Sequence, residues 1–137
     1  KETKDIEKSD IVLLGVSRTS KTPTSIYLAN RGYKTSNIPI ISEKSLPKKI
    51  IENPKLTCVI GLLSEASRLI DIRKNRIAIL KEKDVSTYTD LDTIESEIKI
   101  AKNLYRKFGW PTIDVTRKSV EETAASVIKI YDIMHSQ

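Results

Sequence analysis

The sequence has few of the residues on which most acid–base and metal chemistry depends. Cys58 is its only cysteine and His135 its only histidine. An internal disulfide and a multi-cysteine metal site are therefore excluded, and histidine-based catalysis and zinc binding are disfavoured. Strand-forming neighbours surround Cys58, which predicts a small buried core residue rather than a reactive thiol. His135 lies near the last residue, which favours an exposed position.

Long apolar stretches and aromatic residues are also scarce. No segment approaches the roughly 18 consecutive apolar residues of a membrane helix, and the opening KETKDIEKSD lacks the apolar run of a secretory signal. We therefore expect no membrane contact and a cytoplasmic location. The formal charge of +6 favours an anionic partner. Because only 5% of residues are aromatic and the basic residues are scattered, a nucleotide or phosphorylated protein is favoured over nucleic acid.

Short apolar runs alternate with helical patterns along the rest of the chain. Strands are expected at 10–14, 34–41, 56–62 and 112–115, and helices at 25–30, 43–52, 64–75, 90–108 and from the Ser119/Glu122 capping box onward. This alternation predicts an α/β fold, a mostly parallel sheet flanked by helices, with 56–62 as a central strand. Residues 10–137 form one expected domain. Residues 1–9 are interpreted as a charged leader or the remnant of a link to a missing N-terminal domain.

The segment GVSRTSKT, from Gly15 to Thr22, lies between the first expected strand and the first expected helix. It resembles the phosphate-binding loop G-x-x-x-x-G-K-[ST], in which backbone N–H groups surround phosphate oxygens. Gly15, Lys21 and Thr22 fit this pattern, whereas Ser20 occupies the second glycine position. The free N–H groups and dipole of the following helix favour an anion there. A polar turn without a ligand is the alternative.

These residues suggest specific roles in phosphoryl transfer. The residues expected to bind nucleotide phosphates are Gly15, Val16, Ser17, Arg18, Thr19, Ser20, Lys21 and Thr22. Lys21 and Arg18 would stabilise transition-state charge, and Thr22 would bind Mg²⁺. The central strand contains no acid that could act as a second magnesium ligand. Asp90 and Asp114 are therefore candidates for the base or a metal contact, with helix capping or surface solvation as the alternative for each.

Four segments together resemble one protein family. They are GVSRTSKTPTSIYLANRGYKTSNIPI, the later IGL, IRKNR at 72–76 and GWPTIDVTRKSVEETAASVI. They are similar to the C-terminal half of the pyruvate,phosphate dikinase regulatory protein family, and the resemblance covers nearly all of the chain from Asp10. SRTSKTP is the usual form in that family, so Ser20 agrees with it. Tyr88, Asp90 and the IDVT at 113–116 resemble the dikinase-directed group more than the sister group that regulates phosphoenolpyruvate synthase.

The resemblance implies a bifunctional P-loop kinase-like enzyme. One activity would phosphorylate a threonine of the dikinase with ADP as donor, and the other would remove that phosphate with inorganic phosphate and release pyrophosphate. ADP and Mg²⁺ would be the cofactors and the dikinase the protein partner. The sequence leaves open whether the protein forms a homo-oligomer. The remaining alternatives are a regulator of phosphoenolpyruvate synthase, a small-molecule P-loop kinase that uses ATP, and a non-catalytic nucleotide-binding module.

Overall fold

The computed structural model describes residue 6 and residues 8–16, 19–65 and 87–136. The side chains described within the longest helix begin at residue 93. In chain order the elements are β1 (Ile11–Gly15), α2 (Lys21–Asn30), β2 (Thr35–Pro39), the 3₁₀ helix η1 (Glu43–Ser45), α3 (Lys48–Glu52), β3 (Cys58–Leu63), α5 (Thr87–Phe108), β4 (Thr112–Asp114) and α6 (Val120–His135).

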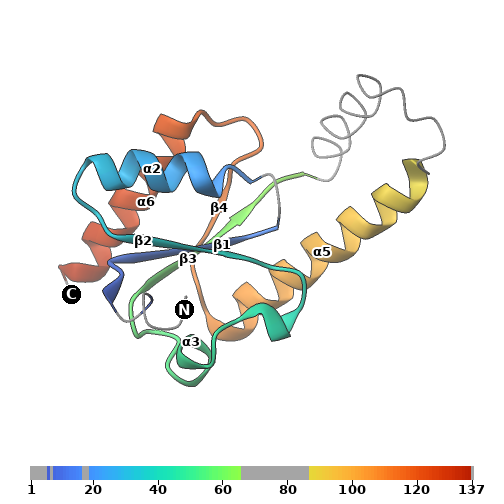
Figure 1. The fold of residues 1–137 in the computed structure, drawn as a ribbon, viewed down its shortest axis with the longest axis horizontal. Helices are drawn as coiled ribbons and strands as arrows, with labels where there is room; N and C mark the ends of the chain where they lie inside the picture. Colours follow the sequence, from blue (N-terminus) through green and yellow to red (C-terminus); the bar gives the residue numbers. More distant parts are fainter. Residues whose placement is uncertain (1–5, 7, 17–18, 66–86, 137) are drawn as a thin grey trace.

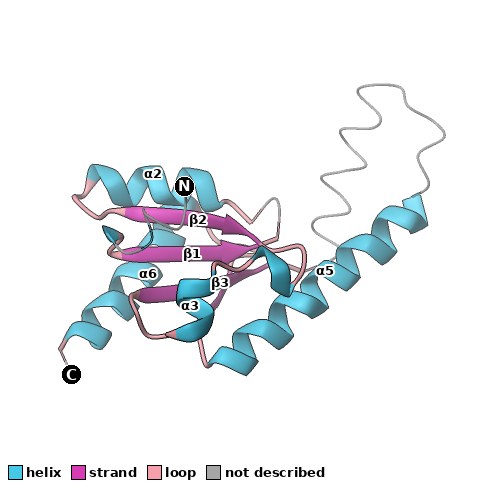
Figure 2. Cartoon of the chain, turned by 60° about the horizontal axis from the view of Figure 1, so that its bottom comes forward, coloured by secondary structure: helices cyan, strands magenta, loops and turns pink. Residues whose placement is uncertain are grey.

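The described strands form one four-stranded sheet in the order β2-β1-β3-β4, and every pair is parallel. Helices α2 and α6 pack on one face of the sheet, and α3 and α5 pack on the other (Figures 1 and 2). The predicted α/β class is confirmed, as is the interior place of β3, between β1 and β4. Among the helices that the structure describes, none combines the length and apolarity needed to cross a bilayer.

Strand β1 contributes to both cores because both faces of the sheet are covered. Val12 and Leu14 belong to the cluster beneath α3 and α5, whereas Ile11 and Leu13 belong to the cluster beneath α2 and α6. All four side chains are fully buried. Since successive side chains of a strand point to opposite faces, burial on both sides requires the continuous apolar run that the sequence shows here.

Helix α5 packs closely against β3 at Gly61. A Cβ atom at Gly61 would lie 2.5 Å from the ring of Tyr105, so only a residue without a side chain fits beneath that ring. The hydroxyl of Tyr105 donates a hydrogen bond of 3.1 Å to the carbonyl oxygen of Leu62. This contact ties the helix to the carboxyl end of the strand.

The single helix predicted for residues 43–52 is wrong. The chain forms η1 and α3 instead, with Pro47 as the N-terminal cap of α3. Proline cannot donate a backbone hydrogen bond and disfavours a helical conformation in the residue before it. Leu46 is accordingly extended, with ψ 134°. The chain therefore restarts its helix after the proline rather than continuing through it.

Two other predicted segments, the helix at 64–75 and the leader at 1–9, are described only in part. The helix predicted for residues 64–75 lies, beyond Glu65, outside the described residues. The predicted leader, residues 1–9, contains Ile6, which is fully buried in the core beneath α3 and α5. At least this residue is therefore packed as part of the domain. Gly32 and Gly109 follow α2 and α5 with positive φ angles, as expected of residues that end helices.

The capping box predicted for α6 is present. The Ser119 hydroxyl accepts a hydrogen bond from the Glu122 amide at 3.1 Å, and the Glu122 carboxylate accepts one from the Ser119 amide at 2.8 Å. We expect Ser119→Ala to lower the free energy of unfolding by about 1 kcal/mol, because one amide of the first helical turn loses its acceptor. Urea denaturation measures this change. Ser96→Ala, on the exposed part of α5, is the matched control and should cause no loss.

Candidate functional site

The carboxyl end of β1 lies at the point where the order of the strands in the sheet reverses. β1 is paired with β2 on one side and with β3 on the other. The chain runs from β1 through α2 to β2, so β3 lies on the opposite side of this connection. In parallel α/β sheets, ligands bind in the crevice outside such a point. The loop that begins at Gly15 is located there.

Gly15 lets this loop fold back on the end of its own strand. Thr19 is fully buried, and its hydroxyl donates a hydrogen bond of 2.8 Å to the carbonyl oxygen of Val16. A Cβ atom at Gly15 would lie 2.6 Å from the Thr19 hydroxyl oxygen and 3.3 Å from the carbonyl oxygen of Leu62. The first glycine of the predicted motif is therefore required by close packing between the loop, β1 and β3.

Ser20 takes the left-handed backbone conformation that glycine adopts most easily. Its φ and ψ angles are 62° and 29°, and it is the N-terminal cap of α2. For a residue with a Cβ this conformation costs about 1 kcal/mol. No side chain of the described residues caps this end of α2. An uncapped helix N-terminus attracts an anion, because its first N–H groups lack partners within the helix.

Lys21 is folded into the loop at the start of α2. Its Nζ donates hydrogen bonds to the carbonyl oxygen of Val16 at 2.8 Å and to the hydroxyl of Thr19 at 3.3 Å. Burial lowers the pKa of Lys21 to about 8. Within the described part of the chain no carboxylate forms an ion pair with it. A partly dehydrated amine beside an uncapped helix end is suited to an anionic group.

We expect anion binding at this loop to be accompanied by proton uptake. With a pKa of about 8, roughly half of the Lys21 side chains are neutral at pH 8 in the free protein. A bound phosphate favours the charged amine and raises its pKa, so binding of a phosphate-bearing ligand at pH 8 should take up about half a proton. Affinity should also fall as the pH rises above 8.

Calorimetry in buffers of different ionisation enthalpy measures the uptake. Lys21→Arg is the matched control, because the guanidinium remains charged and should take up no proton at pH 8. Equal proton uptake by both proteins would contradict the assignment of this titration to Lys21.

Asp114 lies at the end of β4 and stabilises the turn that follows it. Its Oδ1 accepts hydrogen bonds from the Thr116 hydroxyl and the Thr116 amide, the latter at 2.9 Å. These two bonds lower the pKa of Asp114. The Thr116 hydroxyl oxygen in turn accepts a hydrogen bond from the Glu65 amide at 3.0 Å. Asp114 caps no described helix, because Ser119 is the N-terminal cap of α6; its bonds instead stabilise the turn after β4, which Thr116 links to the segment after β3.

Asp114 also faces a hollow of about 540 Å³ between α5 and the carboxyl ends of β3 and β4. The polar and charged residues that line it are Ser64, Glu65, Glu95, Lys99, Lys102 and Asp114. Because all strands are parallel, this hollow opens at the same edge of the sheet as the loop after β1. The place of Asp114 is therefore compatible with a contact to a second substrate.

The other predicted site residues are placed as follows. Ser17 and Arg18 lie outside the described residues, and Asp90 lies on α5 where the side chains are not described. Thr22 is exposed in the first turn of α2. The predicted roles of all these residues stay predictions. Cys58 is buried as expected, and burial raises the pKa of its thiol to about 11.

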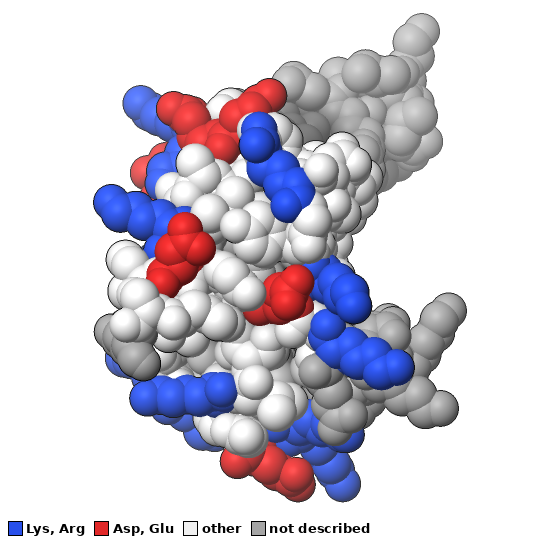
Figure 3. Space-filling view, turned by 90° about the vertical axis from the view of Figure 1, so that its left-hand side faces the viewer, with Lys and Arg blue, Asp and Glu red and all other residues white. Residues whose placement is uncertain are grey.

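Sequence reasoning missed the residues of the hollow on β3 and α5. Ser64, Lys99 and Lys102 come together only because α5 packs across the sheet. Lys99 and Lys102 are three residues apart and share a helix face, which was the one available signal. Charge is otherwise dispersed: on the face that Figure 3 shows, basic and acidic side chains are interspersed rather than gathered into one patch.

The fold and the site define an α/β domain that presents a lysine-bearing loop at the N-terminus of a helix, at the ligand-binding edge of a parallel sheet. The sequence pattern of the kinase/pyrophosphorylase family matches residues 1–128, and the chain belongs to that family. The resemblance drawn from the loop and the later segments is therefore confirmed.

Curated relatives agree with this assignment. The chain is 65% identical over 129 residues to a protein of Pelagibacter ubique (strain HTCC1062), and the match covers 94% of this chain and 47% of the relative. It is 49% identical over 133 residues to a protein of Erythrobacter litoralis (strain HTCC2594), which covers 96% and 47%. Both are named provisionally as pyruvate, phosphate dikinase regulatory proteins. The chain spans about half the length of these relatives.

Proposed function

We propose that this chain is the phosphoryl-transfer domain of a regulator of pyruvate, phosphate dikinase. In this proposal ADP is the donor, a threonine of the dikinase is the acceptor, and inorganic phosphate reverses the modification. The observation that supports it best is the position of Lys21, whose Nζ lies within the loop at the uncapped start of α2. A cytoplasmic location belongs to the same proposal.

The loop has the donors that a diphosphate requires. The first N–H groups of α2 and the Lys21 amine can bind phosphate oxygens, and Gly15 lets the loop pack closely at the end of β1. Arg18 would add a second cation. Among the described residues no group of three or more histidine, cysteine or acidic side chains could hold a metal ion. In this proposal magnesium is held by the Thr22 hydroxyl together with the phosphates of the nucleotide.

The proposed forward reaction breaks one phosphorus–oxygen bond of ADP and forms another. The threonine hydroxyl loses its proton, its oxygen attacks the β-phosphorus, and AMP leaves. In the reverse direction an oxygen of inorganic phosphate attacks the phosphothreonine phosphorus. The bond between that phosphorus and the threonine oxygen breaks, the threonine oxygen takes up a proton, and pyrophosphate is released as the product. Lys21 would stabilise the charge on the transferred group in both directions.

An acid near the acceptor hydroxyl would complete the site. Asp114 is the candidate that faces the hollow at the carboxyl edge of the sheet. The hydrogen bonds from Thr116 keep Asp114 ionised. Its carboxylate can therefore accept a hydrogen bond from the hydroxyl of the substrate threonine and orient that hydroxyl. Asp90, on α5, is the second candidate.

A donor assay tests the proposed function. The protein is incubated with the dikinase and ADP labelled at the β-phosphate, and we expect labelled phosphothreonine on the dikinase together with AMP. ATP freed of ADP should support no transfer. Transfer from ATP but not from ADP would instead indicate an ordinary ATP-dependent kinase. Phosphoenolpyruvate synthase as acceptor is the matched control for the target, and preferential labelling of it would overturn the choice of the dikinase.

A further inference from the structure

Among the described strands, β2 forms one edge of the sheet. The carbonyl oxygen of Lys34 accepts the amide of Ile11, and the amide of Ile40 donates to the carbonyl oxygen of Gly15. In a parallel strand the N–H and C=O of one residue point to the same side, and the side alternates along the strand. Thr35 and Asn37 therefore present their backbone donors and acceptors away from β1. Pro39, the next residue in this set, presents a carbonyl alone.

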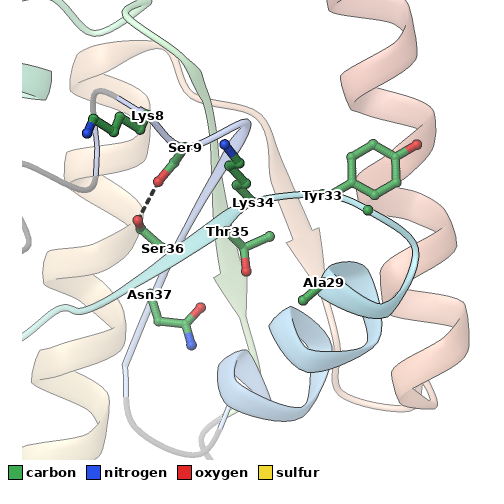
Figure 4. Close-up of a pocket in the computed structure, with 9 residues that line it drawn as sticks. Lys8, Ser9, Ala29, Tyr33, Lys34, Thr35, Ser36 and Asn37 are labelled. Carbon is green, nitrogen blue, oxygen red and sulfur yellow. Dashed lines mark hydrogen bonds between the residues drawn. The ribbon is translucent and has the colours of Figure 1, made fainter.

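Two hollows lie along this outer edge and meet at Asn37. The first has a volume of about 750 Å³ and extends from Lys8 past Lys34 to Asn37 (Figure 4). The second, of about 420 Å³, extends from Asn37 to the segment that contains Ile41 and Lys44. Both hollows are lined by Asn37, and together they border every residue of β2; we call the pair the β2 groove. An extended peptide could lie in it.

The charged side chains described in the β2 groove are all basic. Lys8, Lys34 and Lys44 line it, and none of its described lining residues is an aspartate or glutamate. Glu43, which is next to Lys44 in sequence, is paired with Lys107 at 2.9 Å. Ile41 is 64% exposed at the same groove and offers an apolar contact. The groove therefore combines outward-facing strand backbone, three amines and an exposed isoleucine side chain.

We propose that the β2 groove binds an acidic polypeptide segment in extended conformation, which adds a strand to the sheet. In this mode of recognition the backbone hydrogen bonds provide affinity and the flanking side chains choose the sequence. The three lysines select acidic side chains and oppose basic ones. A second copy of this chain is a poorer occupant, because two such edges would bring six lysines together in a protein of net charge +6.

This surface is separate from the loop and does not depend on the proposed function. The loop begins at the carboxyl end of β1, at its junction with β3, whereas the groove follows the side of β2 that faces away from β1. Binding at the groove can therefore be measured without a nucleotide, and failure of one proposal leaves the other intact.

Selection from a library of random seven-residue displayed peptides tests the proposal on the 137-residue chain. We expect the selected peptides to be rich in aspartate and glutamate. They should shift the amide resonances of Thr35 and Asn37, and their affinity should fall with salt. A variant with Lys8→Gln, Lys34→Gln and Lys44→Gln should bind them at least about tenfold more weakly. Lys55→Gln, at an exposed lysine outside the groove, is the matched control and should bind them normally.

Thr35→Pro tests the backbone pairing itself. The substitution removes an outward N–H and leaves the hydrogen bonds to β1 in place, so binding should fall at least about tenfold while the protein stays folded. Peptides without acidic enrichment, or acidic peptides that bind both variants normally, would overturn the proposal. The lysines and Pro39 would then serve only to keep the edge from pairing with other chains.

Discussion

In the proposed transfer reaction, replacing Lys21 by alanine is expected to lower the rate by about 100- to 1,000-fold. This is the usual cost of removing one donor that stabilises transition-state charge. Within the described part of the loop, Lys21 is the side chain that carries a positive charge, and its Nζ is held by Val16 and Thr19 beside the start of α2. The transfer assay from ADP to the dikinase measures the change.

The burial of Lys21 allows chemistry to be separated from folding. Burial lowers the pKa of Lys21 to about 8, so keeping its amine charged at pH 7 costs free energy in the folded state relative to the unfolded state. Its removal should therefore not lower the melting temperature. Lys48→Ala, at the exposed start of α3, is the matched control and should leave both transfer and stability unchanged. Full transfer by the stable Lys21→Ala protein would show that the loop is not the phosphate site.

Replacing Gly61 by alanine is expected to lower the free energy of unfolding by about 3 kcal/mol. The new methyl group would lie 2.5 Å from the ring of Tyr105, and overpacking of a well-packed core typically costs about 1–3 kcal/mol. The ring cannot move without disturbing its hydroxyl bond to Leu62, so we expect the upper part of this range. Urea denaturation measures the loss.

Two variants control for other effects of replacing a glycine. Gly32→Ala adds a methyl group where nothing lies within 4 Å, so it should cost only the strain of its positive φ angle, about 1 kcal/mol. Combining Gly61→Ala with Tyr105→Leu should cost less than the sum of the two single changes, because the smaller side chain makes room. Additive losses would show that the ring is not the source of the destabilisation.

The strands could be predicted from sequence because each is a short apolar run between turn residues. All four lie within about two residues of their predicted positions, and Gly32 and Gly109 end their helices as expected. The split at Pro47 could have been foreseen from the rule that disfavours a helical residue before proline. Ser20 raised the right question in the sequence, and its left-handed backbone shows that the chain keeps the glycine-like turn.

Other features had no local signal. Tyr105 lies over Gly61 and is hydrogen-bonded to Leu62, which lies 43 residues earlier in the chain. The hollow that contains Asp114 likewise depends on how α5 crosses the sheet, and a helical pattern gives the apolar face but not the partner beneath it. The loop could be predicted from its motif between a strand and a helix, whereas the β2 groove follows from strand order and register, which periodicity does not determine.

The packing at Gly15 and Gly61 limits how the gene for this chain can vary. Every base change that replaces a glycine with another amino acid adds at least a Cβ atom, and at these two positions that atom would overlap Thr19 or Tyr105. At these two codons, only silent base changes leave the packing undisturbed. Gly32 and Gly109 have open space around them and positive φ angles, so a mutation to aspartate can persist there. Two of the four glycines are thus constrained by packing, and the other two by their backbone conformation.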